Sequence, residues 1–169
     1  MKLPETFSDQ MTVHAIIETP RGSRNKFDYD GTLELFKLKK VFPPGTSLPF
    51  PMGFIPHTKG EDGVPLDIFV LTEDETYPGC LIESRVIGIV KIYQTGSNDG
   101  LIRNDRVHAV PAAAAEFATV TEAAMVDQLK LQALIDFCVY YNRYEGKHID
   151  VRGVGSAAEG LASIRKGMC

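Results

Sequence analysis

The sequence has few cysteines and no long apolar run. Its three cysteines, Cys80, Cys138 and Cys169, are odd in number and widely separated. This pattern favours reduced thiols in a cytosolic protein over a disulfide framework or a zinc cluster. No apolar run approaches the roughly 18 residues of a membrane helix, and the N-terminal stretch MKLPETFSDQM lacks the apolar core of a signal peptide. We therefore expect a cytoplasmic protein without a membrane partner.

The chain also lacks an excess of positive charge, with 18 Lys and Arg against 22 Asp and Glu. The formal net charge is −4, and the chain shows no basic face interleaved with aromatic residues. Nucleic acids and anionic membranes attract positively charged proteins, so neither is expected as a partner. The four histidines lie far apart without the spacing of metal ligands, which favours structural or surface roles for them.

Alternating apolar positions and turn residues predict strands over most of residues 12–95. The expected strands cover residues 13–17, 26–30, 66–71 and 80–93, the last with a bend near Gly88. Asp30-Gly31 predicts a tight turn into TLELF and therefore a hairpin. Residues 42–65 hold six of the ten prolines, which indicates a long rigid loop with little strand pairing.

The later part of the chain changes character and predicts helices. Thr119 and Glu122 form a capping-box pattern that predicts the start of a long helix ending near Tyr144. Spacings of three and four predict its core-facing stripe, which consists of Val126, Leu129, Ala133, Phe137, Tyr140 and Tyr144. Strands are expected at 106–111 and 148–154, and Ser156 with Glu159 predicts a last helix ending near Gly167. The chain therefore reads as one α+β domain, 1–169, with a small closed or nearly closed barrel and helices outside it.

The stretch EDGVPLDIFV, residues 61–70, places two carboxylates at the start of a buried strand. Asp62 and Asp67 could hold a divalent cation, because carboxylate oxygens are ligands for Mg²⁺. Val64 lies between them and offers a metal nothing. The stretch therefore carries an acidic residue on each side of an apolar one.

Three segments together resemble the soluble family I inorganic pyrophosphatases. The first is ETPRGSRNKFDYD, similar to that family's E-x-P-x-G-S-R-x-K-[YF]-E-Y-D stretch. The second is MGFIPHT with DGVPLDIFV, similar to Y-G-[FY]-I-x-x-T and the D-x-D-P-x-D signature. The third is VHAVP with FCVYYNRYEGK, where the family has VAVP and F-F-x-x-Y-K-x-L-E-x-x-K. Order and spacing agree from about residue 12 to about residue 150.

The resemblance implies a fold, an activity and a set of site residues. The fold would be an OB-like closed five-stranded β-barrel with flanking α-helices, commonly assembled as a homo-hexamer. The activity would be Mg²⁺-dependent hydrolysis of pyrophosphate, in which metal ions generate a hydroxide and basic side chains neutralise phosphate oxygens. By position, the metal ligands would be Glu18, Asp28, Asp62 and Asp67, and the phosphate contacts Lys26, Lys40, Arg106 and Tyr141. Asp67, Lys26 and Tyr141 would act in catalysis.

Several positions depart from the family pattern. Val64 stands where the family has its general-base aspartate, and Leu48 and Met52 stand where two tyrosines are usual. Gln94, Thr95 and Asn104 replace acids, and Asn142 replaces a lysine. Four of eight acids are therefore gone, so fewer Mg²⁺ ions than the family norm are expected, with Mn²⁺ as another candidate. Asp99 or Asp105 could supply a replacement carboxylate.

Three functions follow from this mixture of matches and departures. One is a pyrophosphatase, or a hydrolase of a related phosphoanhydride, with impaired or altered activity. Another is a non-catalytic protein of the same fold that binds phosphate-containing ligands or acts in assembly. A third is a cleft adapted to a less charged substrate such as a nucleotide or a phospho-sugar. For Arg21 and Arg24 the sequence favours a solvated basic loop.

Overall fold

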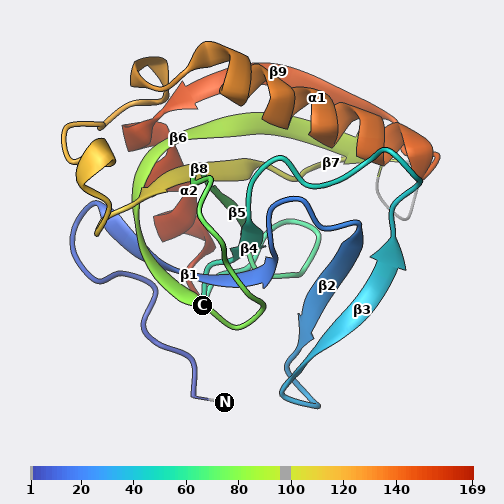
Figure 1. Ribbon diagram of the computed structural model, residues 1–169, viewed down its shortest axis with the longest axis horizontal. Helices are drawn as coiled ribbons and strands as arrows, with labels where there is room; N and C mark the ends of the chain where they lie inside the picture. The colour runs from blue at the N-terminus through green and yellow to red at the C-terminus, as the bar shows by residue number, and fades with distance from the viewer. Residues whose placement is uncertain (1, 96–99) are drawn as a thin grey trace.

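Five strands close into a ring at the centre of the fold (Figure 1). The structure is a computed structural model that describes residues 2–95 and 100–169. Around the ring lie β1 (Thr12–Thr19), β4 (Met52–Phe54), β5 (Asp67–Val70), β8 (Arg106–Pro111) and β6 (Leu81–Thr95). β6 pairs with β1 and closes the ring; only the β5–β8 pair within it is parallel. The predicted α+β fold with a closed five-stranded barrel is confirmed.

The long strand β6 organises the rest of the sheet. It also pairs with β7 (Leu101–Arg103) and β9 (Ile149–Ser156). Its register against β8 shifts between Val86 and Gly88, and such a bulge bends a strand. A Cβ on Gly88 would lie 2.9 Å from the carbonyl oxygen of Gly155, so β9 can approach this closely because residue 88 is glycine. The predicted bend near Gly88 is confirmed.

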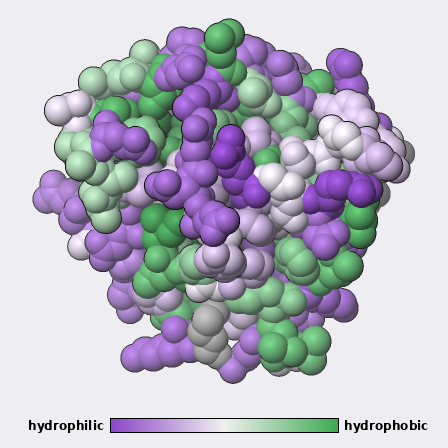
Figure 2. Space-filling view, in the orientation of Figure 1, coloured by the Kyte–Doolittle hydropathy of each residue, from purple (hydrophilic) through white to green (hydrophobic). Residues whose placement is uncertain are grey.

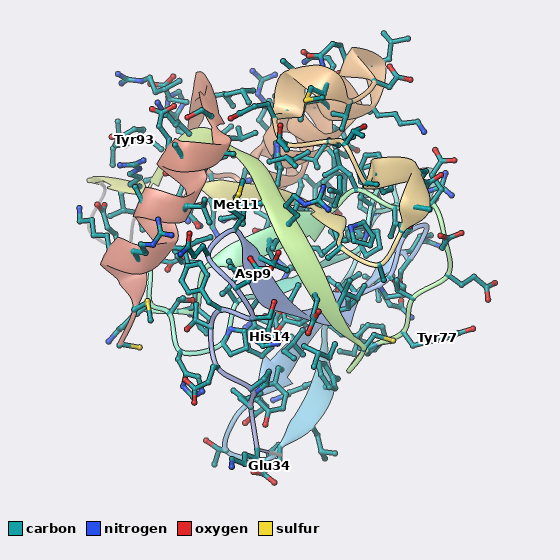
Figure 3. All side chains as sticks on the ribbon, turned by 90° about the vertical axis from the view of Figure 1, so that its left-hand side faces the viewer. Asp9, Met11, His14, Glu34, Tyr77 and Tyr93 are labelled. Atoms are coloured by element: carbon teal, nitrogen blue, oxygen red, sulfur yellow. The ribbon has the colours of Figure 1, made fainter. Side chains whose placement is uncertain are left out.

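A separate hairpin, β2 (Asn25–Asp30) with β3 (Leu35–Val41), projects beside the barrel (Figure 1). The hairpin was predicted, but its connection is longer than a tight turn at Asp30-Gly31. The carboxylate of Asp30 accepts the N–H groups of Thr32 and Leu33, which delays the second strand to Leu35. Glu34 lies at the hairpin tip (Figure 3). Figure 2 shows a hydrophobic area at its lower edge, where the hairpin tip lies in Figure 1.

The proline-rich stretch 42–65 is not wholly a loop, because it contains β4. A Cβ on Gly53 would lie 1.9 Å from the carbonyl oxygen of Ile16 in β1. The glycine therefore lets a three-residue strand between Pro51 and Pro56 enter the ring. Proline content alone did not reveal this strand, since both prolines lie outside the paired residues.

The long helix is shorter than predicted. α1 spans Gln128–Tyr144, and its N-cap is Asp127, whose carboxylate accepts the N–H of Leu129. The capping box at Thr119 is wrong: Glu122 instead accepts the N–H of Ala157. Residues 115–127 contain two 3₁₀ turns, η1 (Ala115–Phe117) and η2 (Ala123–Met125).

The predicted core-facing stripe is right only at Val126 and Phe137, which pack against the core. Leu129 is 81% exposed and Tyr144 is 63% exposed. The buried positions are Leu131, Leu134, Cys138 and Asn142. These residues also repeat every three or four positions, so periodicity was satisfied by both stripes and packing against the barrel decided between them.

Two apolar clusters fill the molecule on opposite faces of the strands. The α2-side cluster joins Ile68 and Val107 to Leu161 and Ile164 of α2 (Ala157–Gly167). The α1-side cluster joins strand residues such as Phe69 and Val110 to Leu134 and Cys138 of α1. Successive side chains of a strand point to opposite faces, and β5, β6 and β8 accordingly contribute residues to both clusters. The predicted capping box of α2, Ser156 with Glu159, is confirmed.

None of the described helices is long and apolar enough to cross a membrane.

Candidate active site

A cleft with two chambers lies on the α1 side of the barrel. The outer chamber has a volume of about 440 Å³, and the inner chamber about 150 Å³. Lys26 and Asp67 line both chambers, so these two residues mark the junction. Among the predicted residues, Glu18 and Asp28 line the outer chamber, and Asp62, Arg106 and Tyr141 line the inner one.

Glu18 lies at the end of β1, where the barrel meets the hairpin. Its side chain is buried, and Oε1 accepts the N–H of Tyr29 at 2.6 Å. Burial raises the pKa of Glu18 to about 7; the negative charge of Asp67 adds to this rise, and the hydrogen bond from Tyr29 opposes it. A carboxyl group in this environment would be stabilised in its ionised form by a nearby cation.

Lys26 and Asp28 are held together on β2. The strand has an irregular register between Lys26 and Phe27, and the side chains of Lys26 and Asp28 form an ion pair. Lys39 approaches the other oxygen of Asp28 at 3.5 Å. Burial acts to lower the pKa of Lys26, but the charges of Asp28 and Asp67 outweigh it and raise that pKa. Lys26 is therefore a charged group at the junction of the chambers.

The two acids of the 61–70 stretch have different surroundings. Asp67 forms an ion pair with Arg106 across the parallel β5–β8 contact, at 2.6 Å. Asp62 accepts the N–H of Val64 at 3.2 Å. Burial raises the pKa of Asp62, and the charge of Asp67 acts in the same direction. The side chain of Val64 lines the outer chamber and the residue is 51% exposed, so an apolar group stands at the cleft mouth.

Lys40 and Tyr141 are brought together at the end of α1. The ammonium of Lys40 lies 4.7 Å from the ring centre of Tyr141 and forms an ion pair with Glu145. Lys147 approaches the same carboxylate at 3.5 Å. Burial raises the pKa of Tyr141. Burial and the charges of Lys26 and Lys147 lower the pKa of Lys40, so the ion pair with Glu145 helps to keep Lys40 charged.

Sequence reasoning missed the part that Glu145 and Lys147 play in this cleft. Both line the inner chamber. Both lie in the segment FCVYYNRYEGK, but neither was assigned a role there, and their position just after α1, beside Tyr141, brings them into the chamber.

The departing positions also gather in the inner chamber. Its lining includes Leu48, Met52, Gln94, Asn104 and Asn142. Leu48 and Met52 belong to the α1-side cluster, so one wall of the chamber is continuous with the core. The other wall presents amides in place of charged groups.

The replacement carboxylates considered from the sequence can be placed only in part. Asp99 lies outside the described residues. Asp105 is buried; one of its oxygens accepts the N–H of Ile92 at 3.0 Å, and the other pairs with Arg103 at 2.6 Å. Its carboxylate is thus occupied in joining β6 to the start of β8. Arg21 and Arg24 donate to backbone carbonyl oxygens of neighbouring loops.

The carboxylate oxygens of the cleft are of the type that a hard divalent cation prefers, but few of them lie together. Within residues 2–95 and 100–169, no three Asp, Glu, His or Cys side chains converge as a preformed metal site. Asp62 and Asp67 nevertheless line one chamber, and Mg²⁺ keeps several waters when one or two carboxylates hold it. The oxygen donors of Asp62 and Asp67 are therefore of the type that a hydrated Mg²⁺ takes.

By architecture, then, the chain is an α+β barrel protein whose cleft pairs acidic with basic side chains. The family model described as inorganic pyrophosphatase matches residues 15–169. Inorganic pyrophosphatases are 33% identical to the chain in Geobacillus stearothermophilus (90% of this chain, 88% of that one) and in Sulfolobus acidocaldarius (98% and 94%). The chain therefore belongs to the inorganic pyrophosphatase family.

Solved structures agree with this assignment. The inorganic pyrophosphatase of Thermus thermophilus superposes with a TM-score of 0.85 at 31% identity, covering 97% of this chain and 93% of that one. The Helicobacter pylori enzyme superposes with a TM-score of 0.88 at 21% identity, covering 98% and 96%; at that identity the likeness concerns the fold.

Proposed function

We propose that the chain hydrolyses pyrophosphate, or a related phosphoanhydride, slowly and with Mg²⁺. The observation that carries the proposal is the junction of the two chambers. There Lys26, Arg106 and Asp67 meet, with Asp62 and Tyr141 in the same inner chamber. The positive charges of Lys26 and Arg106 can bind phosphate oxygens, and the neighbouring carboxylates can bind a cation. The relatives named inorganic pyrophosphatase support the reaction type.

Each residue has a definite part in this proposal. Asp62 and Asp67 would hold the hydrated ion, which when bound neutralises phosphate charge and lowers the pKa of a water. Lys26, Arg106 and Tyr141 would bind and orient the phosphate oxygens, with Lys40 beside them. Glu18 and Asp28 would face the outer side of the ligand. Because Lys26, Lys40 and Arg106 are each already paired with a carboxylate, the ligand has to displace those contacts.

The low rate follows from Val64. A general base typically contributes about 10²- to 10⁴-fold to a rate, and valine cannot accept a proton. Four acids are also too few for several ions, so the charge neutralisation supplied to the leaving group is reduced.

The test is phosphate release from pyrophosphate in Mg²⁺ and separately in Mn²⁺. Val64→Asp should raise turnover, while Asp67→Asn, which removes a ligand and the partner of Arg106, should abolish it. The Asp67→Asn protein also exposes any contaminating pyrophosphatase. Release that equals this background in both metals would reject the enzymatic proposal.

The alternative is a protein of this fold that binds phosphate-containing ligands without hydrolysis. Val64 in the outer chamber and Leu48 and Met52 in the inner chamber favour it, since these side chains offer neither a metal ligand nor a donor for phosphate oxygens. Calorimetry with pyrophosphate separates the two functions: binding without release supports the alternative, and the absence of both heat and thermal stabilisation removes it.

The remaining predictions concern organisation. We propose that residues 1–169 act as one domain in the cytoplasm and assemble as a homo-oligomer, a hexamer by resemblance. Sedimentation equilibrium of the purified chain checks the assembly, and a monomer at all concentrations would contradict it.

A further inference from the structure

Three amide side chains meet in the inner chamber from three different elements. Gln94 comes from the end of β6, Asn104 from the residues just before β8, and Asn142 from the last turn of α1. They share the chamber with Arg106 and Tyr141. Gln94 is 7% exposed and Asn142 is 3% exposed, so both amides are largely withdrawn from bulk water.

The hydrogen bonds of these amides leave groups unused inside the chamber. Asn142 donates through Nδ2 to the carbonyl oxygen of Cys138 at 2.8 Å, and Oδ1 of Asn104 accepts from Arg106. No hydrogen bond of the Gln94 side chain is found within the described residues, and its amide atoms are not among the fully buried polar atoms without a partner, so the amide is open to the chamber that Gln94 lines. An amide that meets only solvent can exchange that water for a hydrogen bond to a ligand. The chamber is therefore prepared for a molecule that can hydrogen-bond to amides.

Inorganic pyrophosphate complements these amides poorly. Its ionised oxygens only accept hydrogen bonds, whereas an amide presents both an N–H donor and a carbonyl acceptor. Because Nδ2 of Asn142 already donates to Cys138, Oδ1 of Asn142 would face a phosphate oxygen with no proton between them. A hydroxyl group both donates and accepts, so it satisfies either end of Gln94.

We propose that the inner chamber binds the hydroxylated organic part of a small organic diphosphate. This rests on the proposed function, because it places the phosphates at the junction of the chambers, on Lys26 and Arg106. The volume of about 150 Å³ limits the organic part to a few carbon atoms. Leu48 and Met52, which are 1% and 6% exposed, offer the apolar wall that carbon atoms require.

Two ligands of matched size test the proposal, 2-hydroxyethyl diphosphate and propyl diphosphate. They differ by a hydroxyl in place of a methyl group. We expect calorimetry in Mg²⁺ to show the hydroxyl ligand binding about tenfold more tightly, because the methyl group leaves Gln94 unsatisfied. Equal affinities, or tighter binding of propyl diphosphate, would overturn the proposal.

Substitutions in the chamber test whether its amides cause the preference for the hydroxyl ligand. Gln94→Met keeps the length of the side chain without its amide, and it should reduce the preference to less than about twofold. Gln132→Met is the matched control, since Gln132 lies exposed on α1 and bonds only to Asp136; it should keep the full preference. If Gln94→Met does not fold, Asn142→Leu supplies the same test. A preference that survives both substitutions would reject the amides as its source.

Binding and hydrolysis are separate readouts. A hydroxyl preference without phosphate release supports the chamber assignment and rejects the proposed hydrolysis. Phosphate release without a hydroxyl preference supports the proposed hydrolysis and rejects the chamber assignment.

Discussion

The two faces of strand β8 carry different kinds of side chain. Val107 and Ala109 point into the α2-side cluster and are fully or almost fully buried among apolar residues. On the opposite face, Arg106 reaches the cleft, and His108, two residues further along the strand, is buried. One face of the strand therefore supports the barrel, while the other carries groups that are costly to bury. On β8, therefore, the α2 side contributes apolar packing, whereas the α1 side combines apolar Val110 with polar and charged residues.

The largest expected effect comes from breaking the α2 side. Ile164→Ala should reduce the free energy of unfolding by about 2–5 kcal/mol, because Ile164 is fully buried and the deletion leaves a cavity. Ligand affinity of the folded protein should stay unchanged. Denaturant unfolding and calorimetry measure the two quantities. As a control, Leu129→Ala on the exposed side of α1 should change stability by less than about 0.5 kcal/mol. A loss of affinity in Ile164→Ala would contradict the separation of the two sides.

On the α1 side, His108 should make stability depend on pH. It is fully buried, neither ring nitrogen has a partner within the described residues, and burial lowers its pKa to about 4. Between about pH 6.5 and pH 4 the unfolded chain binds the proton more readily, so stability is full above pH 6.5 and falls as pH falls. The loss should approach about 3 kcal/mol at pH 4.

The control for this effect is a residue that cannot titrate. His108→Leu should lose this component, so the stability difference between the two proteins should change by nearly the same amount from pH 7 to pH 4. Parallel pH profiles for the two proteins would show that His108 is not the source.

A smaller effect is expected from the carboxylate that competes within the cleft. Glu145→Gln should tighten the binding of inorganic pyrophosphate about three- to tenfold at low salt, because Lys40 and Lys147 lose their carboxylate partner. The backbone N–H of Glu145 still caps α1. Calorimetry measures the affinity. Glu73→Gln, which removes the partner of Lys130 outside the cleft, should leave it unchanged; an equal change in both variants would indicate a general charge effect.

The smallest expected effect concerns the start of α1. Asp127→Ala should reduce stability by about 1 kcal/mol, because its carboxylate caps the N–H of Leu129. Thr119→Ala should change it by less than about 0.5 kcal/mol, since the capping box expected there does not form. Thermal unfolding distinguishes the two variants. A larger loss for Thr119→Ala would mean that the helix start has been placed incorrectly.

The patterns that predicted correctly were local or ordered along the chain. Ser156 and Glu159 form their capping box within one turn of helix, and the bend at Gly88 follows from one residue without a side chain. The stripe of α1 failed because two sets of residues share the same spacing, and only contact with the barrel buries Leu134 and leaves Leu129 in solvent.

The features of the site also divide into those that motif order predicted and those that depend on tertiary contacts. Motif order alone predicted a shared site for Lys26, Asp67 and Tyr141, and all three line the inner chamber. It could not show that Glu145 pairs with Lys40, since 105 positions separate them in the sequence. Nor could it show that three separate departures from the family pattern line one small chamber.

The sequence by itself determined most of the strands, the capped last helix and the family, because these follow from spacing and order along the chain. Only the tertiary structure decided which face of α1 is buried, which carboxylate each cleft cation contacts, and that Gln94, Asn104 and Asn142 meet. The physical reason is that these outcomes depend on contacts between distant segments, where packing selects one arrangement from several that local propensity allows equally.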